Sequence, residues 1–193
     1  MSRPREFDID RALHQSMEVF WTKGFKSTSF EDLTRTTKVK KQSFYGVFKD
    51  KRALFLKTLT RYRELSLASL EERVSQELSP LQKLQTVREA MLRPDDDTVD
   101  CGCFMVNSIL EFGTEDEEVS REIELMFSRV EQLLEEIIRS GQEQKQITTR
   151  FSSHELAACL NNALLGAKIL EKSGASQERI AMILRTSFAM MEP

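Results

Sequence analysis

Apolar residues recur every three or four positions along most of the chain, which is the spacing of helices that bury one face. The first such stripe, Ile9, Leu13, Met17 and Phe20, lies in residues 9–23. Asp8 is a plausible N-cap for this helix, and Gly24 supplies the left-handed residue that can end it. The same spacing predicts eight further helices at about 30–36, 40–46, from 51 onward, 80–93, 102–112, 115–141, 153–172 and 177–191.

Other local signals support these helices. Ser29 with Asp32 and Ser152 with Glu155 have the spacing of capping boxes, Asp50 can cap the fourth helix, and Thr114 can open the seventh. The stripe of the fourth helix is formed by Leu54, Phe55, Leu59, Tyr62 and Leu65. Strand signals are almost absent, and 193 residues contain only four prolines and seven glycines. The sequence therefore predicts an all-α fold of about nine helices.

Charge divides the chain unevenly. Residues 1–63 hold 15 Lys and Arg against 7 Asp and Glu, a balance of +8, and the remainder balances at −11, which together give the net charge of −3. A basic N-terminal part on an acidic remainder is typical of a protein that contacts phosphates with one part only.

Several classes of protein are disfavoured by the composition. Three cysteines are too few for a disulfide framework. The N-terminal residues contain no apolar run of the signal-peptide kind, and no apolar stretch is long enough to cross a membrane. We expect a cytoplasmic protein with no cofactor and no metal site, and no group of residues resembles a catalytic constellation, so we do not expect an enzyme.

The most specific stretch is residues 24–55, GFKSTSFEDLTRTTKVKKQSFYGVFKDKRALF. It predicts two short helices joined by a tight turn, with lysines in front of the second and another helix after it. In a helix-turn-helix, one helix crosses the phosphates of double-stranded DNA and the next lies in the major groove. This stretch therefore indicates a DNA-binding head.

The same stretch resembles the DNA-binding head of the TetR family of transcriptional regulators. The matching residues are Gly24, Phe25, Thr28, Ser29, Leu33, Val39, Ser43, Phe44, Tyr45, Phe48, Lys51, Leu54 and Phe55. There are two departures from the family pattern, since Gln42 stands where the family often has glycine, and Gly46-Val47 replaces an aromatic or histidine pair. The resemblance implies a helix-turn-helix domain over residues 1–50 and an effector-binding and dimerisation domain over residues 51–193.

The resemblance and the chemistry of the side chains together give a set of expected DNA contacts. These are Thr28, Ser29, Lys38, Lys40, Lys41, Gln42, Ser43, Tyr45 and Lys51. Hydroxyls at a helix N-terminus can hold a phosphate. Gln pairs with adenine and Lys with guanine, so Gln42 and its neighbouring lysines are expected at base edges. Tyr45 and Lys51 are expected at phosphates.

For the body, the resemblance implies a homodimer that binds operator DNA as a repressor and is released by a small effector, whose identity is unknown. The expected effector pocket is lined by Leu84, Met91, Phe104, Met105, Asn107, Phe112, Met126 and Phe127. The expected dimer interface uses small and apolar residues of the eighth helix, Leu156, Ala163, Gly166, Ala167 and Leu170.

Two alternatives remain open at this stage. In the first, the same head is controlled by covalent modification of Cys101 or Cys103, which lie close to a helix N-terminus, where thiols tend toward thiolate. The acidic run Asp95–Asp97 with Asp100 opposes such ionisation. In the second, the chain is a helical binding module or an enzyme that does not bind DNA.

Overall fold

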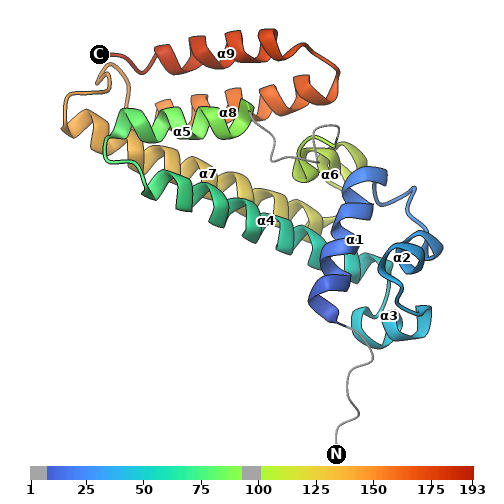
Figure 1. Ribbon diagram of the computed structural model, residues 1–193. Coiled ribbons are helices and arrows are strands. Elements are labelled where there is room, and N and C mark those ends of the chain that lie inside the picture. The colour runs from blue at the N-terminus through green and yellow to red at the C-terminus, as the bar shows by residue number, and fades with distance from the viewer. Residues whose placement is uncertain (1–7, 93–100) are drawn as a thin grey trace, which may run out of the picture. The chain divides into compact units, whose positions relative to one another are not determined.

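The computed structural model describes residues 8–92 and 101–193, and in these ranges it contains nine α-helices and no strand (Figure 1). The helices are α1 (Ile9–Lys23), α2 (Phe30–Thr37), α3 (Lys41–Phe48), α4 (Lys51–Ser75), α5 (Pro80–Leu92), α6 (Phe104–Phe112), α7 (Glu117–Glu143), α8 (Ser153–Lys172) and α9 (Gln177–Ala189). The predicted all-α fold is confirmed. The acidic run before Cys101 lies outside the described residues.

The predicted caps are present where their partners are local. The Asp8 carboxylate accepts from the backbone N–H of Arg11 at 3.1 Å, and the Asp50 carboxylate accepts from that of Ala53 at 2.7 Å. Both predicted capping boxes form, with Ser29 at the start of α2 and Ser152 at the start of α8. Such caps satisfy N–H groups that have no partner within the helix, so they determine where each helix begins.

Three local predictions were wrong. Helix α7 begins at Glu117 and not after Thr114, because the Asp116 carboxylate, rather than the Thr114 hydroxyl, accepts from a backbone N–H of its first turn. The same helix continues past Gly141 to Glu143. A Cβ on Gly141 would lie 2.4 Å from the side chain of the buried Ile147, so this glycine permits a close approach and does not end the helix. Leu65 is 47% exposed and lies outside the core.

The chain forms two compact units, which we call the head and the body. The head comprises Met1–Leu65 and Asn107–Ile123, and the body comprises Ser66–Val106 and Glu124–Pro193. Helices α4, α6 and α7 each contribute residues to both units. The compact unit around the helix-turn-helix motif therefore extends beyond the predicted boundary at residue 50 and includes the end of α6 and the beginning of α7.

An aromatic cluster forms part of the head's core. Phe55 of α4 is fully buried, and its ring centroid lies 5.2 Å from that of Phe20, 5.1 Å from that of Phe25 and 5.2 Å from that of Phe112. Aromatic pairs at this spacing add about 0.5–1.5 kcal/mol each to the burial of their area. The cluster joins α1, α4 and the end of α6, next to the turn that leads into α2 and α3.

The core of the body is mostly aliphatic and lies among α4, α5, α7, α8 and α9. Helix α8 packs along α9, and α5 packs against both, as the green and orange-to-red ribbons of Figure 1 show. Leu134, Ile138, Leu160 and Leu184 are among its most buried side chains. The described helices are either too short or too polar to cross a membrane.

Candidate nucleic-acid interface

The start of α2 is organised by Ser29 and Asp32. The Ser29 hydroxyl accepts from the backbone N–H of Asp32 at 3.1 Å and donates to its carboxylate at 2.7 Å. The same carboxylate pairs with Lys23 at 2.5 Å and with Arg35 at 2.7 Å. The hydrogen bonds from Lys23 and then Ser29 hold the pKa of Asp32 well below its usual range. Ser29 remains exposed at this helix N-terminus, and its hydroxyl is held by Asp32.

Helix α3 presents the polar face that the sequence predicts. Phe44 and Phe48 are buried inside the head, while Lys40, Lys41, Gln42 and Tyr45 are exposed. Lys38 is also exposed and adopts a left-handed backbone conformation with φ of 59° in the turn, and Ser43 is half-buried.

The first turn of α3 contains no acidic residue, and no side chain caps its N–H groups. A helix N-terminus that has lysines beside it and no acidic residue in its first turn attracts phosphate oxygens.

The exposed side of α3 packs against an aromatic residue, Phe30, that was not among the expected DNA contacts. Phe30, the first residue of α2, packs against Tyr45 of α3 with ring centroids 4.8 Å apart. The Lys41 ammonium lies 5.6 Å from the centroid of Phe30 and 5.8 Å from that of Tyr45. Phe30 is half-buried, links the two helices of the motif and makes a cation–π contact with Lys41.

Two predicted contact residues point into the head's own backbone. Thr28 is 2% exposed, and its hydroxyl donates to the carbonyl of Gly24 at 2.6 Å. The Lys51 ammonium donates to the carbonyls of Phe25 and Thr28, both at 2.9 Å. Direct phosphate contact by these two side chains stays a prediction, and the structure gives each of them a different partner.

Ion pairs fasten α4 to the beginning of α7 within the head. The Arg52 guanidinium donates to the Asp116 carboxylate at 2.7 and 2.8 Å, and it also pairs with Glu118 at 2.6 Å. Arg63 pairs with Glu122 at 3.0 Å. The hydrogen bonds from Arg52 lower the pKa of Asp116, and the two carboxylates raise the pKa of Arg52. These contacts join segments about sixty residues apart in the chain.

The residues of the predicted effector pocket are distributed over both units. Leu84, Phe104 and Met105 are buried in the body, and Met126 and Phe127 are half-buried there. The other three predicted pocket residues are Asn107, Phe112 and Met91. Asn107 and Phe112 belong to the head, where the ring of Phe112 lies 5.2 Å from that of Phe25. The side chain of Met91 lies outside the described residues.

The predicted dimer residues do not all lie on one surface of α8. Leu156 and Ala167 are in the body's core, and Leu170 packs against that core. Ala163 and Gly166 are half-buried, and a Cβ on Gly166 would meet nothing within 4 Å. Two exposed apolar residues that the sequence reasoning missed, Ile169 on α8 and Met182 on α9, are 48% and 49% exposed.

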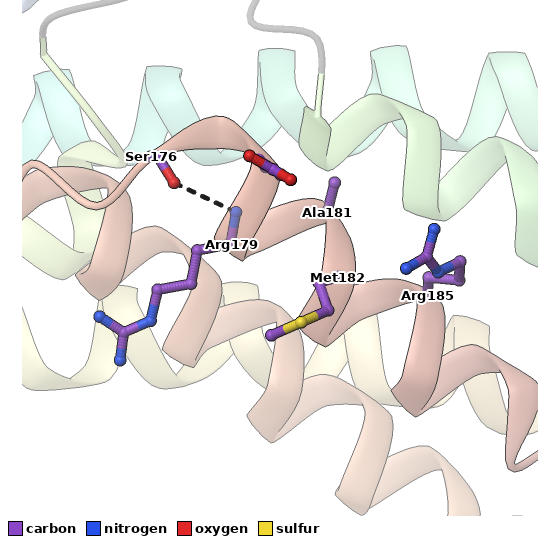
Figure 2. A pocket seen from close by; sticks show the side chains of 6 residues that line it. Ser176, Arg179, Ala181, Met182 and Arg185 are labelled. Atoms are coloured by element: carbon purple, nitrogen blue, oxygen red, sulfur yellow. Dashed lines mark hydrogen bonds between the residues drawn. The ribbon is translucent and has the colours of Figure 1, made fainter.

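Helix α9 also carries an open pocket of about 420 Å³, drawn in Figure 2. All of its lining residues come from α9 and its cap: Ser176, Glu178, Arg179, Ala181, Met182 and Arg185. The dashed line in Figure 2 is the capping hydrogen bond between Ser176 and the backbone N–H of Arg179. A depression on one face of a single helix is a surface feature and not an enclosed effector chamber.

The cysteines differ in exposure. Cys103, directly before α6, is 8% exposed, Cys101 is half-buried and Cys159 on α8 is exposed. Among the described residues, no group of three or more His, Cys, Asp and Glu side chains has the arrangement of a metal site.

Two protein-family models match this chain. The model described as "Bacterial regulatory proteins, tetR family" matches residues 12–58, which contain α2 and α3. The model described as "Tetracyclin repressor-like, C-terminal domain" matches residues 80–186. Together they span the helix-turn-helix and most of the body.

Curated relatives match along the whole chain. The HTH-type transcriptional repressor ComR of Escherichia coli (strain K12) is 27% identical over 193 residues, which cover 97% of this chain and 90% of the relative. The HTH-type transcriptional regulator YezE of Bacillus subtilis (strain 168) is 26% identical and is matched over 100% of both chains.

Solved structures share the fold. A cysteine mutant of the TetR family transcriptional regulator CifR, complexed with 26-base-pair operator DNA, matches with a TM-score of 0.84 and 25% identity over 98% of this chain and 100% of the other. The reduced form of NemR from Escherichia coli matches with a TM-score of 0.85 and 21% identity, over 95% of this chain and 97% of the other.

Proposed function

Since this chain belongs to the TetR family of transcriptional regulators, it binds DNA to regulate transcription, and we propose that it is a homodimeric repressor released from a near-palindromic operator by a small effector. The observation that carries the proposal is the exposed N-terminal half of α3. It presents Lys40, Lys41 and Gln42 at a helix start that no side chain caps and where no acidic residue stands.

The positions of these residues suggest which of them contact bases and which contact phosphates. Side chains in the first turn of a recognition helix reach base edges, so Gln42 and Lys41 are assigned to bases. Tyr45 is 44% exposed one turn later, where its hydroxyl can donate to a phosphate oxygen. Ser29 and Lys38, at the two ends of α2, are assigned to the phosphate backbone together with Ser43.

Dimerisation follows from the number of recognition helices. One chain supplies one α3, whereas a palindromic operator presents two half-sites about 34–36 Å apart along one face of the duplex. A dimer contact through α8 and α9 is supported by the open space at Gly166 and by the apolar area that Ile169 exposes on α8 and Met182 on α9. Close approach of two helices favours small residues of this kind at the contact.

Repression and release by an effector rest on similarity and on the body. The relative ComR is named a repressor. The body contains residues unrelated to DNA contact, among them the buried Phe104 and Met105 and the half-buried Phe127, in the region assigned to the effector. A cytoplasmic location belongs to the same proposal, because operator DNA lies there.

The proposal is tested by selecting genomic fragments with the purified chain and titrating a selected duplex at several salt concentrations. Neutralised phosphates release counterions, so the affinity is expected to fall steeply as salt rises. A chain that retains no fragment above background, or whose binding does not depend on salt, would contradict the proposed role of α3.

A second candidate is control of the same head by covalent modification of Cys101 or Cys103. The observation that favours it is the position of Cys103, which directly precedes α6, the helix whose other end is part of the head. Mass spectrometry after mild electrophile treatment, combined with operator titration, separates it from a reversible effector. The low exposure of Cys103 favours the reversible effector.

A further inference from the structure

Two oppositely charged side chains hold the turn between α1 and α2, residues 24–29. The Glu111 carboxylate, from the end of α6, accepts from the backbone N–H groups of Phe25 at 2.7 Å and Lys26 at 2.5 Å. The Lys51 ammonium, from the start of α4, donates to the carbonyls of Phe25 and Thr28 at 2.9 Å and lies 4.2 Å from the centroid of the Phe25 ring. All five residues belong to the head.

The conformation of this turn suits the two contacts. Gly24 has a φ of +81°, and a Cβ there would lie 3.0 Å from a Glu111 carboxylate oxygen. The Lys26 ammonium donates to the Glu111 carbonyl at 3.1 Å, which adds a second link to the end of α6. The two N–H groups donate to a carboxylate and the three carbonyls accept from ammonium groups, so each of these hydrogen bonds is charge-assisted and roughly twice as strong as a neutral one.

The turn leads directly to the DNA-binding face. Ser29, its last residue, caps α2, and Phe30 then packs against Tyr45 of α3. A shift of the turn would therefore move the Ser29 hydroxyl and the aromatic support of α3 together. By its charge alone, Glu111 would lower the affinity of the head for DNA, since a carboxylate repels the phosphates that the lysines attract.

We propose that Glu111 and Lys51 are positioning residues for DNA recognition, which clamp the α1–α2 turn from opposite sides and act through Ser29 and α3 without contacting DNA. This inference rests on the proposed function of α3. It assigns the Lys51 ammonium to the protein's own carbonyls instead of to a phosphate. It also makes Glu111 necessary for tight binding although its charge opposes binding.

Whether Glu111→Gln raises or lowers the affinity for operator DNA tests the proposed clamp. If Glu111 acted only as a nearby negative charge, its neutralisation would tighten binding to a selected operator duplex. As a clamp, its neutralisation should weaken binding roughly tenfold, because hydrogen bonds to a charged acceptor are lost. Glu115→Gln is the matched control, since it makes the same charge change at an exposed position four residues later and should leave binding equal or slightly tighter.

A local measurement separates positioning from general stability. In Glu111→Gln, amide hydrogen exchange should accelerate at Phe25 and Lys26, while the buried amide of Leu33 keeps its protection and the thermal midpoint stays within a few degrees of the parent's. Weaker binding accompanied by faster exchange throughout the head would show a merely structural role and overturn the proposal.

Salt dependence tests Lys51 independently. Removing a phosphate contact reduces the slope of log affinity against log salt by about 0.9 for each chain. Lys51→Ala should weaken binding without changing this slope, whereas Lys38→Ala, at an exposed position assigned to the phosphate backbone, should reduce it. A reduced slope for Lys51→Ala would place that ammonium on a phosphate. If Lys51→Ala does not fold, the Glu111 arm still decides the matter.

Failure of the inference differs from failure of the proposed function. If the parent chain binds duplex DNA and Glu111→Gln binds as well or better, the clamp is wrong and the role of α3 stands. If the parent chain itself binds no duplex, the proposed function is wrong and the clamp falls with it.

Discussion

Gln42→Ala should relax base preference at the operator without changing the stability of the chain. Gln42 is exposed in the first turn of α3, and Lys40 rather than Gln42 occupies the N-cap position. A surface substitution of this kind changes the free energy of unfolding by less than about 0.5 kcal/mol. Its effect on unfolding is therefore expected to be small compared with its effect on DNA binding.

The expected loss of operator affinity depends on how many Gln42 side chains contact the operator. A bidentate contact between Gln and a base contributes about 1–3 kcal/mol of discrimination against the wrong base. A dimer contains two α3 helices, so a palindromic operator would lose about 2–6 kcal/mol, or roughly 30-fold to 10⁴-fold in affinity. Non-specific duplex should be bound as before, because the phosphate contacts remain.

Competition titration with the operator and with duplexes changed at each position gives the test. For Gln42→Ala the penalty for mismatched bases should shrink at one symmetric pair of positions and stay unchanged elsewhere. Lys38→Ala is the comparison, since its side chain is assigned to a phosphate, and it should weaken binding to operator and non-specific duplex and reduce the salt dependence. An unchanged mismatch profile in Gln42→Ala would refute the assignment of Gln42 to a base edge.

Three further predictions address the body. Gly166→Glu should yield monomers with poor operator affinity in sedimentation experiments, whereas Leu81→Glu, at a 44% exposed apolar position on α5, should stay dimeric; an intact Gly166→Glu dimer would move the interface elsewhere. The double substitution of Cys101 and Cys103 by Ser should leave folding, operator binding and effector response in place, and loss of the response alone would make covalent control the leading account. Gly141→Ala should lower the free energy of unfolding by about 1–3 kcal/mol in chemical denaturation, because its Cβ would meet a buried isoleucine at 2.4 Å, and an unchanged midpoint would show that this contact relaxes freely.

Sequence reasoning succeeded where the determining contacts are local. The capping boxes at Ser29 and Ser152 join residues three apart, and the buried faces of the helices follow from the repeat of apolar residues. The exposed polar face of α3 is a consequence of the same periodicity, since burial of Phe44 and Phe48 turns Lys41 and Gln42 outward.

Contacts whose partner is distant or belongs to the backbone could not be predicted from the sequence. Glu111 lies 86 residues from Phe25, and no local pattern connects a carboxylate in α6 with two N–H groups in the α1–α2 turn. Lys51 has the sequence position of a phosphate contact, but carbonyl groups already accept from its ammonium. The small residues of α8 drew attention to Ala167, whereas the packing of α5, α8 and α9 buries it and leaves Ile169 outside.

The central claim, that α3 reads the major groove from two chains at once, is tested most directly by methylation interference on a selected operator. Methylation of guanine N7 alters the major-groove edge of guanine, which a lysine reads and which is therefore assigned to Lys41. The account predicts interference in two symmetric clusters on one face of the duplex, separated by about one helical turn or a multiple of it. A single cluster, or strong binding that no major-groove methylation disturbs, would contradict it.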